Sequence, residues 1–139
     1  MQQLFGTLIF AALIASISAG IQSTAVTGIL ICGKSPYPFA TVELWDKDTL
    51  DPDDLMANGT SEHDGGFFLQ GNQSELTTID PELRIFHKCG DPTAKCYKQI
   101  IIEIPDDFVT ADEKPQKIYQ VHTIDLKVVT STESKICEE

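Results

Sequence analysis

The chain has 139 residues, enough for a leader segment and one domain but not for two independent cores. It carries 21 Asp and Glu residues against 10 Lys and Arg, and this net charge of −11 excludes a general binder of nucleic-acid phosphates. A composition of 42% hydrophobic and 22% charged residues is that of a folded globular protein, not of a disordered or multi-span membrane protein. These figures predict one acidic domain.

An uncharged apolar segment opens the chain. Residues 1–20 contain no charged side chain, and the apolar run over 4–17 is 14 residues long. This length is typical of a secretory signal peptide and is shorter than the roughly 20 residues that span a bilayer. We expect cleavage after Ser18, Ala19 or Gly20, although no Lys or Arg precedes the run. The sequence therefore predicts a signal peptide over 1–20 and a secreted, not transmembrane, domain over 21–139. The alternative is an uncleaved anchor or a buried first helix.

Four cysteines, Cys32, Cys89, Cys96 and Cys137, fall in the predicted mature domain. An even number in a secreted chain predicts two disulfides, with three pairings open. We favour Cys89 with Cys96, which would close a short loop containing Gly and Pro, and Cys32 with Cys137, which would tie the C-terminus to an early strand. A zinc site is the weaker alternative, because the sequence contains no CxxC pair and no HxxxH pair.

Two sequons occur in the same domain. They are Asn58-Gly59-Thr60 and Asn72-Gln73-Ser74, and neither has proline in the middle. In a secreted chain Asn58 and Asn72 are candidate glycosylation acceptors, which would place both on the surface.

Runs rich in β-branched and aromatic residues, separated by turn-forming clusters, predict an all-β protein. The expected strands cover 24–32, 40–46, 66–70, 83–88, 97–104 and 119–129. Alternation in two of these runs predicts half-buried strands whose inward residues are Val42 and Leu44, and Ile100, Ile102 and Ile104. Six such strands over about 100 residues favour a two-sheet antiparallel β-sandwich.

Two local patterns add detail to this prediction. Near the C-terminus, His122, Ile124, Leu126 and Val128 alternate with polar residues, so they are expected to face the core, with His122 as a core histidine. The Asp64-Gly65 dipeptide predicts a hairpin that joins a strand ending near residue 62 to one beginning near residue 67.

Seven segments and one cysteine share their order with a known family: 26–34, 42–48, 51–55, 60–67, 75–81, 85–89, Cys96 and 104–106. In this order they resemble the nematode transthyretin-like proteins. The resemblance runs from about Val26 to Cys137 and includes all four cysteines. It implies a transthyretin-like β-sandwich, secretion and no established enzymatic activity, since members of that family are extracellular and are discussed as binding or signalling proteins.

An enzyme of the same fold is not expected. Hydrolases related to transthyretin, which cleave 5-hydroxyisourate, use conserved histidines, an arginine and a C-terminal Tyr-Arg-Gly-Ser motif, whereas this chain ends Ile-Cys-Glu-Glu. His63, His87 and His122 lie in different predicted elements, without the spacing of a catalytic triad, and are expected to be structural or solvated. We therefore expect neither catalysis nor a cofactor.

Acidic residues concentrate between positions 43 and 64, where eight Asp and Glu face Lys47 alone. Oxygen ligands of this kind bind Ca²⁺, but the Asp46-Lys47-Asp48 start fails as an EF-hand because the sixth position is Asp51, not Gly. A solvated acidic loop is the favoured interpretation. The weaker hypothesis is a calcium site drawn from Asp46, Asp48, Asp51, Asp53 and Asp54.

Basic residues concentrate around Cys89 and Cys96. Asp91 is the one acid between positions 84 and 98 that opposes four basic side chains. Such a patch fits an anionic lipid headgroup or an acidic receptor surface, although dispersed surface charge is the favoured interpretation. The patch consists of Arg84, Lys88, Lys95 and Lys98.

Three functions remain in competition. The leading one is a secreted recognition module whose loops bind an extracellular protein or a cell surface, with anionic phospholipid as an alternative partner. The second is a carrier of a small hydrophobic ligand by analogy with transthyretin, which would require a tetramer. The third, a hydrolase, is disfavoured.

Overall fold

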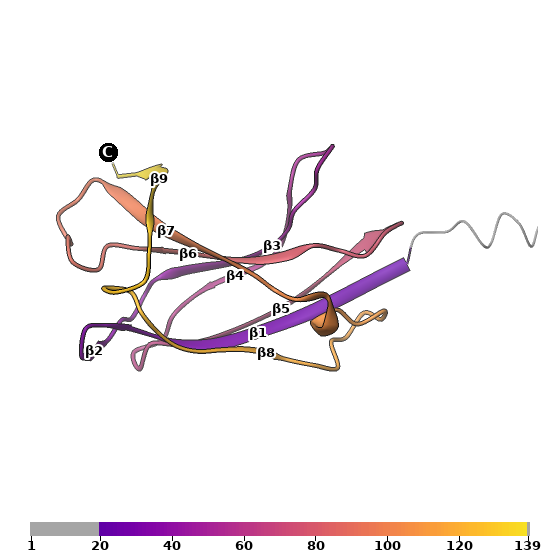
Figure 1. The fold of residues 1–139 in the computed structure, drawn as a ribbon, viewed down its shortest axis with the longest axis horizontal. Coiled ribbons are helices and arrows are strands. Elements are labelled where there is room, and N and C mark those ends of the chain that lie inside the picture. The colour runs from indigo at the N-terminus through magenta and orange to yellow at the C-terminus, as the bar shows by residue number, and fades with distance from the viewer. Residues whose placement is uncertain (1–19, 139) are drawn as a thin grey trace, which may run out of the picture.

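Two β-sheets stacked face to face make up the computed structural model, which describes residues 20–138 (Figure 1). The predicted signal peptide therefore lies almost wholly outside the described residues. Within 20–138, no helix has the length and apolar character needed to cross a membrane. The elements are β1 (Gly20–Cys32), β2 (Ser35–Pro36), β3 (Thr41–Asp46), β4 (Asp54–Thr60), β5 (Gly66–Glu75), β6 (Pro81–His87), β7 (Cys96–Glu103), the 3₁₀ turn η1 (Asp106–Phe108), β8 (Tyr119–Asp125) and β9 (Thr132–Cys137).

One sheet has the order β2-β1-β5 with β8 also paired to β1, and the other has the order β4-β3-β6-β7-β9. Neighbouring strands run antiparallel, except that β8 lies parallel to β1. The all-β, two-sheet prediction is confirmed, and each of the six predicted runs contains a strand. Three further strands, β2, β4 and β9, lie outside these six runs, and of the three only β4 was expected, as the strand before the Asp64-Gly65 turn.

The core lies between the sheets and follows the predicted alternation. In β3 the inward residues Val42 and Leu44 are buried, and Leu44 pairs in register with Leu83 of β6, which is also fully buried. Each buried leucine of this kind stabilises the fold by about 1.5–3 kcal/mol relative to exposure. In β7, Ile100 is buried and Ile102 is half-buried against the core, as predicted.

In the predicted run over 119–129, the first and last of the four residues that were expected to face the core do not do so. Ile124 and Leu126 are buried, but His122 is exposed and Val128 is 77% exposed. The cause is an irregularity in the pairing of β1 with β8, where Thr27 and Ile29 match Gln120 and Thr123 and leave one extra residue in β8. His122 takes a φ of 59° at this point, so the alternation breaks.

The Asp64-Gly65 hairpin prediction is also wrong, although a tight turn is present. The Gly65 N–H donates to the Glu62 carbonyl at 2.8 Å, but the turn joins β4 in one sheet to β5 in the other. Gly65 has a φ of +83°, and a Cβ there would lie 2.1 Å from the Leu30 carbonyl oxygen. The turn therefore packs against β1 and crosses between the sheets.

The disulfides pair Cys32 with Cys89 and Cys96 with Cys137, which corrects the favoured connectivity. Cys32 ends β1 and Cys89 follows β6, so the first disulfide joins the two sheets. Cys137 belongs to the unpredicted strand β9, whose pairing with β7 places it directly opposite Cys96. With separations of 57 and 41 residues, each link stabilises the fold by about 4 kcal/mol in the chain-entropy model.

Candidate functional site

Four carboxylates converge at the end of the sandwich where the β3–β4 loop meets the end of β5. Asp46 ends β3, Asp48 follows it in the loop, Asp54 begins β4 as the register partner of Asp46, and Glu75 ends β5 in the other sheet. One oxygen from each of the four lies within 4.8 Å of the others. We call these residues the acidic site.

Asp46 occupies an inward position of its strand and is only 1% exposed. Its Oδ1 accepts a hydrogen bond from the Asp80 N–H at 2.9 Å, whereas its Oδ2 is buried and has no hydrogen-bond partner among residues 20–138. A hollow of about 520 Å³ borders the site and is lined in part by Asp46, Asp48 and Glu75. A buried carboxylate oxygen without a partner is costly, so the site is short of positive charge or of donors.

Two hydrogen bonds accepted by Asp53 hold the β3–β4 loop in this conformation. The Asp53 Oδ1 accepts from the Asp48 N–H at 3.0 Å, and its Oδ2 accepts from the Arg84 Nη2 at 2.6 Å. Arg84 also donates to Glu82 at 2.6 Å and lies 4.5 Å from the centre of the Trp45 ring. The hydrogen bond from Arg84 is the main reason that the pKa of Asp53 is lowered.

The close approach of these carboxylates favours the protonated forms of Glu75 and Asp48. The pKa of Glu75 is raised, chiefly because its protonated form can donate a hydrogen bond to the Asp46 carboxylate, and the pKa of Asp48 is raised, first by burial and then by the charge of Asp46. Within the described residues no Lys or Arg forms an ion pair with any of the four. The acidic site therefore concentrates negative charge that the protein itself does not neutralise.

Of the predicted calcium ligands, the structure brings together Asp46, Asp48 and Asp54. Asp51 is not one of the four grouped carboxylates, and Asp53 forms an ion pair with Arg84. Glu75 was missed because it lies on another strand and in the other sheet. The predicted strand ended at residue 70, five residues before Glu75, so the sequence did not place this carboxylate at the end of a strand.

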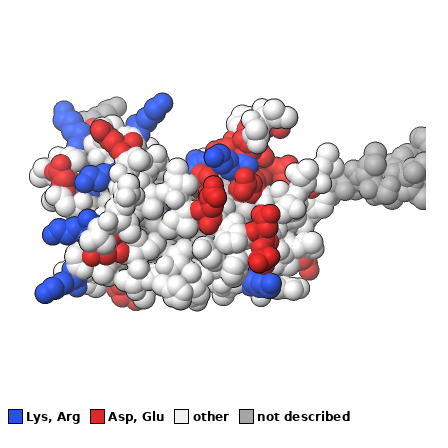
Figure 2. Space-filling model, in the orientation of Figure 1, with Lys and Arg blue, Asp and Glu red and all other residues white. Residues whose placement is uncertain are grey.

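The opposite end of the sandwich carries both disulfides and most of the lysines, seen at the left of Figure 2. Five exposed lysines come from the β1–β2 turn, the start of β7, the residues after β8, and β9. Within residues 20–138 none of the five forms an ion pair. We call these residues the lysine end: Lys34, Lys95, Lys98, Lys127 and Lys135.

The predicted basic patch is only partly assembled. Lys95 and Lys98 belong to the lysine end, but Arg84 lies at the acidic end in its ion pairs with Asp53 and Glu82. Lys88 is half-buried, donates to Glu138 at 2.9 Å and lies 4.6 Å from the centre of the Tyr97 ring. Sequence proximity placed Arg84 in the patch, but β6 carries it away from Lys88 and toward the acidic loop.

Two shallow hollows cut into the lysine end. One of about 360 Å³ is lined by Lys98, Lys127 and Ser131 among others, and one of about 340 Å³ by Lys95, Lys98 and Glu133 among others. Lys98 borders both, so it is central to this surface.

The buried histidine is His87, not His122. It is 1% exposed, its Nδ1 accepts from the Cys89 N–H at 3.0 Å, and its Nε2 lies 3.1 Å from the Ser131 hydroxyl. Burial and the nearby charge of Lys98 lower the pKa of His87 to about 4, so the ring is neutral at physiological pH. His63 is exposed and packs edge-on against Phe39, so each of the three histidines sits in a different environment.

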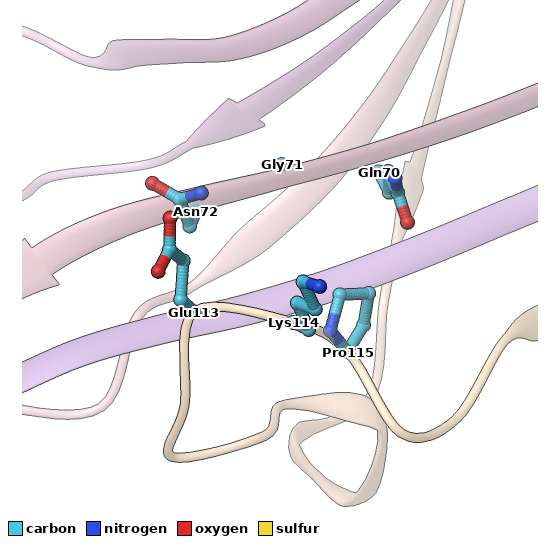
Figure 3. A pocket seen from close by; sticks show the side chains of 6 residues that line it. All are labelled: Gln70, Gly71, Asn72, Glu113, Lys114 and Pro115. Carbon is cyan, nitrogen blue, oxygen red and sulfur yellow. The ribbon is translucent and has the colours of Figure 1, made fainter.

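Both sequon asparagines are exposed, Asn58 on β4 and Asn72 on β5. Asn72 lines a hollow of about 480 Å³ between β5 and the loop before β8. Figure 3 shows Asn72 and Glu113 at one end of this hollow and Gln70 with Pro115 at the other. The side chains are placed where a glycan could be attached, and their glycosylation stays a prediction.

Comparison with known proteins identifies transthyretin-like proteins of a nematode as relatives of this chain. Transthyretin-like protein 33 of Caenorhabditis elegans is 40% identical over 117 residues, covering 84% of this chain and 82% of that protein. Transthyretin-like protein 5 of the same nematode is 37% identical, covering 84% of each chain. Among solved structures, a 9R-lipoxygenase from Cyanothece matches with 23% sequence identity and a TM-score of 0.45. The match covers 76% of this chain and 16% of the lipoxygenase chain, and it is too weak to support a comparison.

A family model agrees with the nematode relatives. The model of the transthyretin-like family, TTR-52, matches residues 27–105, from β1 to the residues just after β7. This chain therefore belongs to the transthyretin-like family.

Proposed function

We propose that this protein is a secreted recognition module that binds an anionic extracellular partner through its lysine end. The observation that carries the proposal is the gathering of exposed, unpaired lysines around the two disulfides within the described residues. The disulfides fix the segments from which these lysines project. A surface that is already rigid loses less conformational entropy on binding.

The net charge of −11 does not oppose such binding, because the acidic site lies at the far end of β1, although Asp91, Glu133 and Glu138 lie among the lysines of the lysine end. β1 runs from Gly20, the register partner of Glu75, to Cys32, which is bonded to Cys89. Its 13 residues, at about 3.3 Å each, span roughly 40 Å. The Debye length at physiological salt is about 8 Å, so an anionic partner at the lysine end is screened from the acidic site.

A specific observation favours a membrane surface as the second candidate partner. Val128 and Ile136, which are 77% and 51% exposed, follow Lys127 and Lys135 directly in the chain. Apolar side chains beside lysines are the combination that anionic phospholipid headgroups attract.

A carrier function for a small hydrophobic ligand has less support. The hollows described above are shallow and lined largely by polar or charged side chains, and a transthyretin-like channel would need a tetramer. The relatives are transthyretin-like proteins, a family not known as enzymes, and we propose binding, not catalysis.

The test compares two charge-matched variants of the labelled, secreted protein on intact cells. Lys98→Glu with Lys127→Glu reverses the charge of the lysine end, and Lys114→Glu with Lys117→Glu makes the same change on the loop before β8. We expect the first variant to lose most cell-surface binding and the second to retain it. Equal binding by both variants would refute the proposal.

A parallel assay identifies the kind of partner. The same proteins are pelleted with vesicles that contain phosphatidylserine and with vesicles of phosphatidylcholine alone. Binding to the anionic vesicles that only the Lys98 and Lys127 variant loses would establish the membrane candidate. Cell binding without vesicle binding would point to an acidic protein.

A further inference from the structure

We propose that Asp46, Asp48, Asp54 and Glu75 form a calcium site that joins the two sheets at the acidic end. The site is independent of the lysine end and goes beyond the recognition function proposed above. Four clustered carboxylates are not enough to identify an ion site, because exposed acidic groups commonly bind no ion. The decisive feature is the buried, unpaired oxygen of Asp46.

Asp46 is placed where a strand normally places an apolar side chain. It follows Val42 and Leu44 on the inward face of β3 and is as fully buried as they are. Its Oδ1 accepts a hydrogen bond from the Asp80 N–H, and its Oδ2 has no donor in the part of the chain that the structure describes. A carboxylate oxygen in this position requires a cation or a proton, since its water has been removed.

The spacing of the oxygens matches the size of the calcium ion. Ca²⁺ binds oxygens at 2.3–2.6 Å, so atoms bound to one ion lie up to about 5 Å apart. The four carboxylate oxygens all fall within 4.8 Å of one another and therefore need no rearrangement to share one ion. Bidentate carboxylates and water from the adjoining hollow complete the six to eight ligands that Ca²⁺ prefers.

The loop that supplies two of the ligands is held in place without the ion. Asp53 bonds both the Asp48 N–H and Arg84, which fixes the path of the chain between Asp48 and Asp54. The backbone N–H of Lys47 also donates to the Asp80 carbonyl at 2.9 Å. A preformed loop of this kind pays little conformational entropy when the ion binds.

The position of Glu75 gives the site its structural role. Asp46, Asp48 and Asp54 belong to β3, β4 and their loop in one sheet, whereas Glu75 ends β5 in the other. A bound ion therefore links the sheets, as the Cys32–Cys89 disulfide does at the opposite end.

The test is a titration of the secreted protein with Ca²⁺ by calorimetry, supported by thermal unfolding. The tag is placed at the C-terminus, because Gly20 pairs with Glu75 and an N-terminal tag would crowd the site. We expect a dissociation constant of about 0.1–1 mM, in the range of extracellular calcium modules, and a melting temperature that rises with Ca²⁺. Trp45, the single tryptophan, adjoins Asp46 and offers a fluorescence signal for the same titration.

The variants separate a built site from diffuse attraction. Glu75→Gln removes the ligand from the other sheet, and Asp48→Asn removes one from the loop, so each should weaken Ca²⁺ binding at least tenfold while the protein stays folded. Glu62→Gln makes the same charge change at an exposed acidic residue that belongs neither to the site nor to the lining of its hollow, and it should bind as wild type does. No heat at millimolar Ca²⁺, or equal weakening by Glu62→Gln, would overturn the proposal.

Discussion

Lowering the pH should destabilise the protein through one buried side chain. His87 ends β6, accepts a hydrogen bond from the Cys89 N–H and lies 3.1 Å from the Ser131 hydroxyl. Its register partner on β7 is Lys98, and the Tyr37 ring packs edge-on with its centroid 6.1 Å away. No carboxylate of the described residues forms an ion pair with the ring, so a proton on His87 would be buried without compensation.

The size of the effect follows from the pKa. The pKa of His87 falls from an ordinary 6.5 to about 4 in the folded protein, so between these values the unfolded chain binds up to one more proton. The contribution to stability is complete above pH 6.5 and is lost as the pH falls toward 4. The slope is at most about 1.4 kcal/mol per pH unit, and the total loss is about 3 kcal/mol.

The assay is urea unfolding across this pH range for three proteins. His87→Asn keeps an acceptor for the Cys89 N–H but cannot titrate, so it should be less stable at every pH and should lack this slope. His63→Gln removes an exposed histidine and should retain the slope of the wild type. If the His87→Asn protein loses stability with falling pH as steeply as the wild type does, the reasoning is refuted.

Two further predictions test the fold. Gly65→Ala should lower the free energy of unfolding by at least about 2 kcal/mol, because the new Cβ would meet the Leu30 carbonyl. Gly90→Ala is the control, since Gly90 has a φ of +87° but lies in open space, and it should lower the free energy of unfolding by about 1 kcal/mol. Equal losses for the two variants in denaturant unfolding would contradict this expectation. The double variant Cys96→Ser, Cys137→Ser should lower the free energy of unfolding by up to about 4 kcal/mol and make β9 accessible to proteases. A peptide map in which β9 remained protected would show that the disulfide does not hold this strand in place.

The fold class was predictable because the central strands carry a strong pattern. Val42 and Leu44 alternate with Thr41 and Glu43 in β3, so burial on one face was visible in the sequence. In β7 the inward Ile100 and Ile102 flank Ile101, which is exposed, so the run was read as a strand from its β-branched residues as well as from its alternation. The strands outside the six predicted runs lack this signal. β4 contains Asn58-Gly59 and lies at an edge of its sheet, where only one side is paired.

The disulfide error arose from the same cause. β9 is largely polar and also lies at an edge, so no strand was predicted around Cys137. Once β9 pairs with β7, Cys137 lies opposite Cys96 and is no longer available to Cys32. Cys32 is then left with Cys89, which the end of β6 brings to it across the sandwich.

The acidic site shows the general limit of reading a site from one sequence. Asp46, Asp48 and Asp54 were visible as a cluster because they lie in one short loop or at its two ends, but a loop with several carboxylates is ordinarily a solvated surface. Two facts distinguish this one, the inward placement of Asp46 and the approach of Glu75 from the other sheet, and both are consequences of how the sheets stack. The choice between a solvated loop and a binding site therefore depends on tertiary packing, and the alternation in β3 was the one hint, since it continued past Leu44 to a carboxylate.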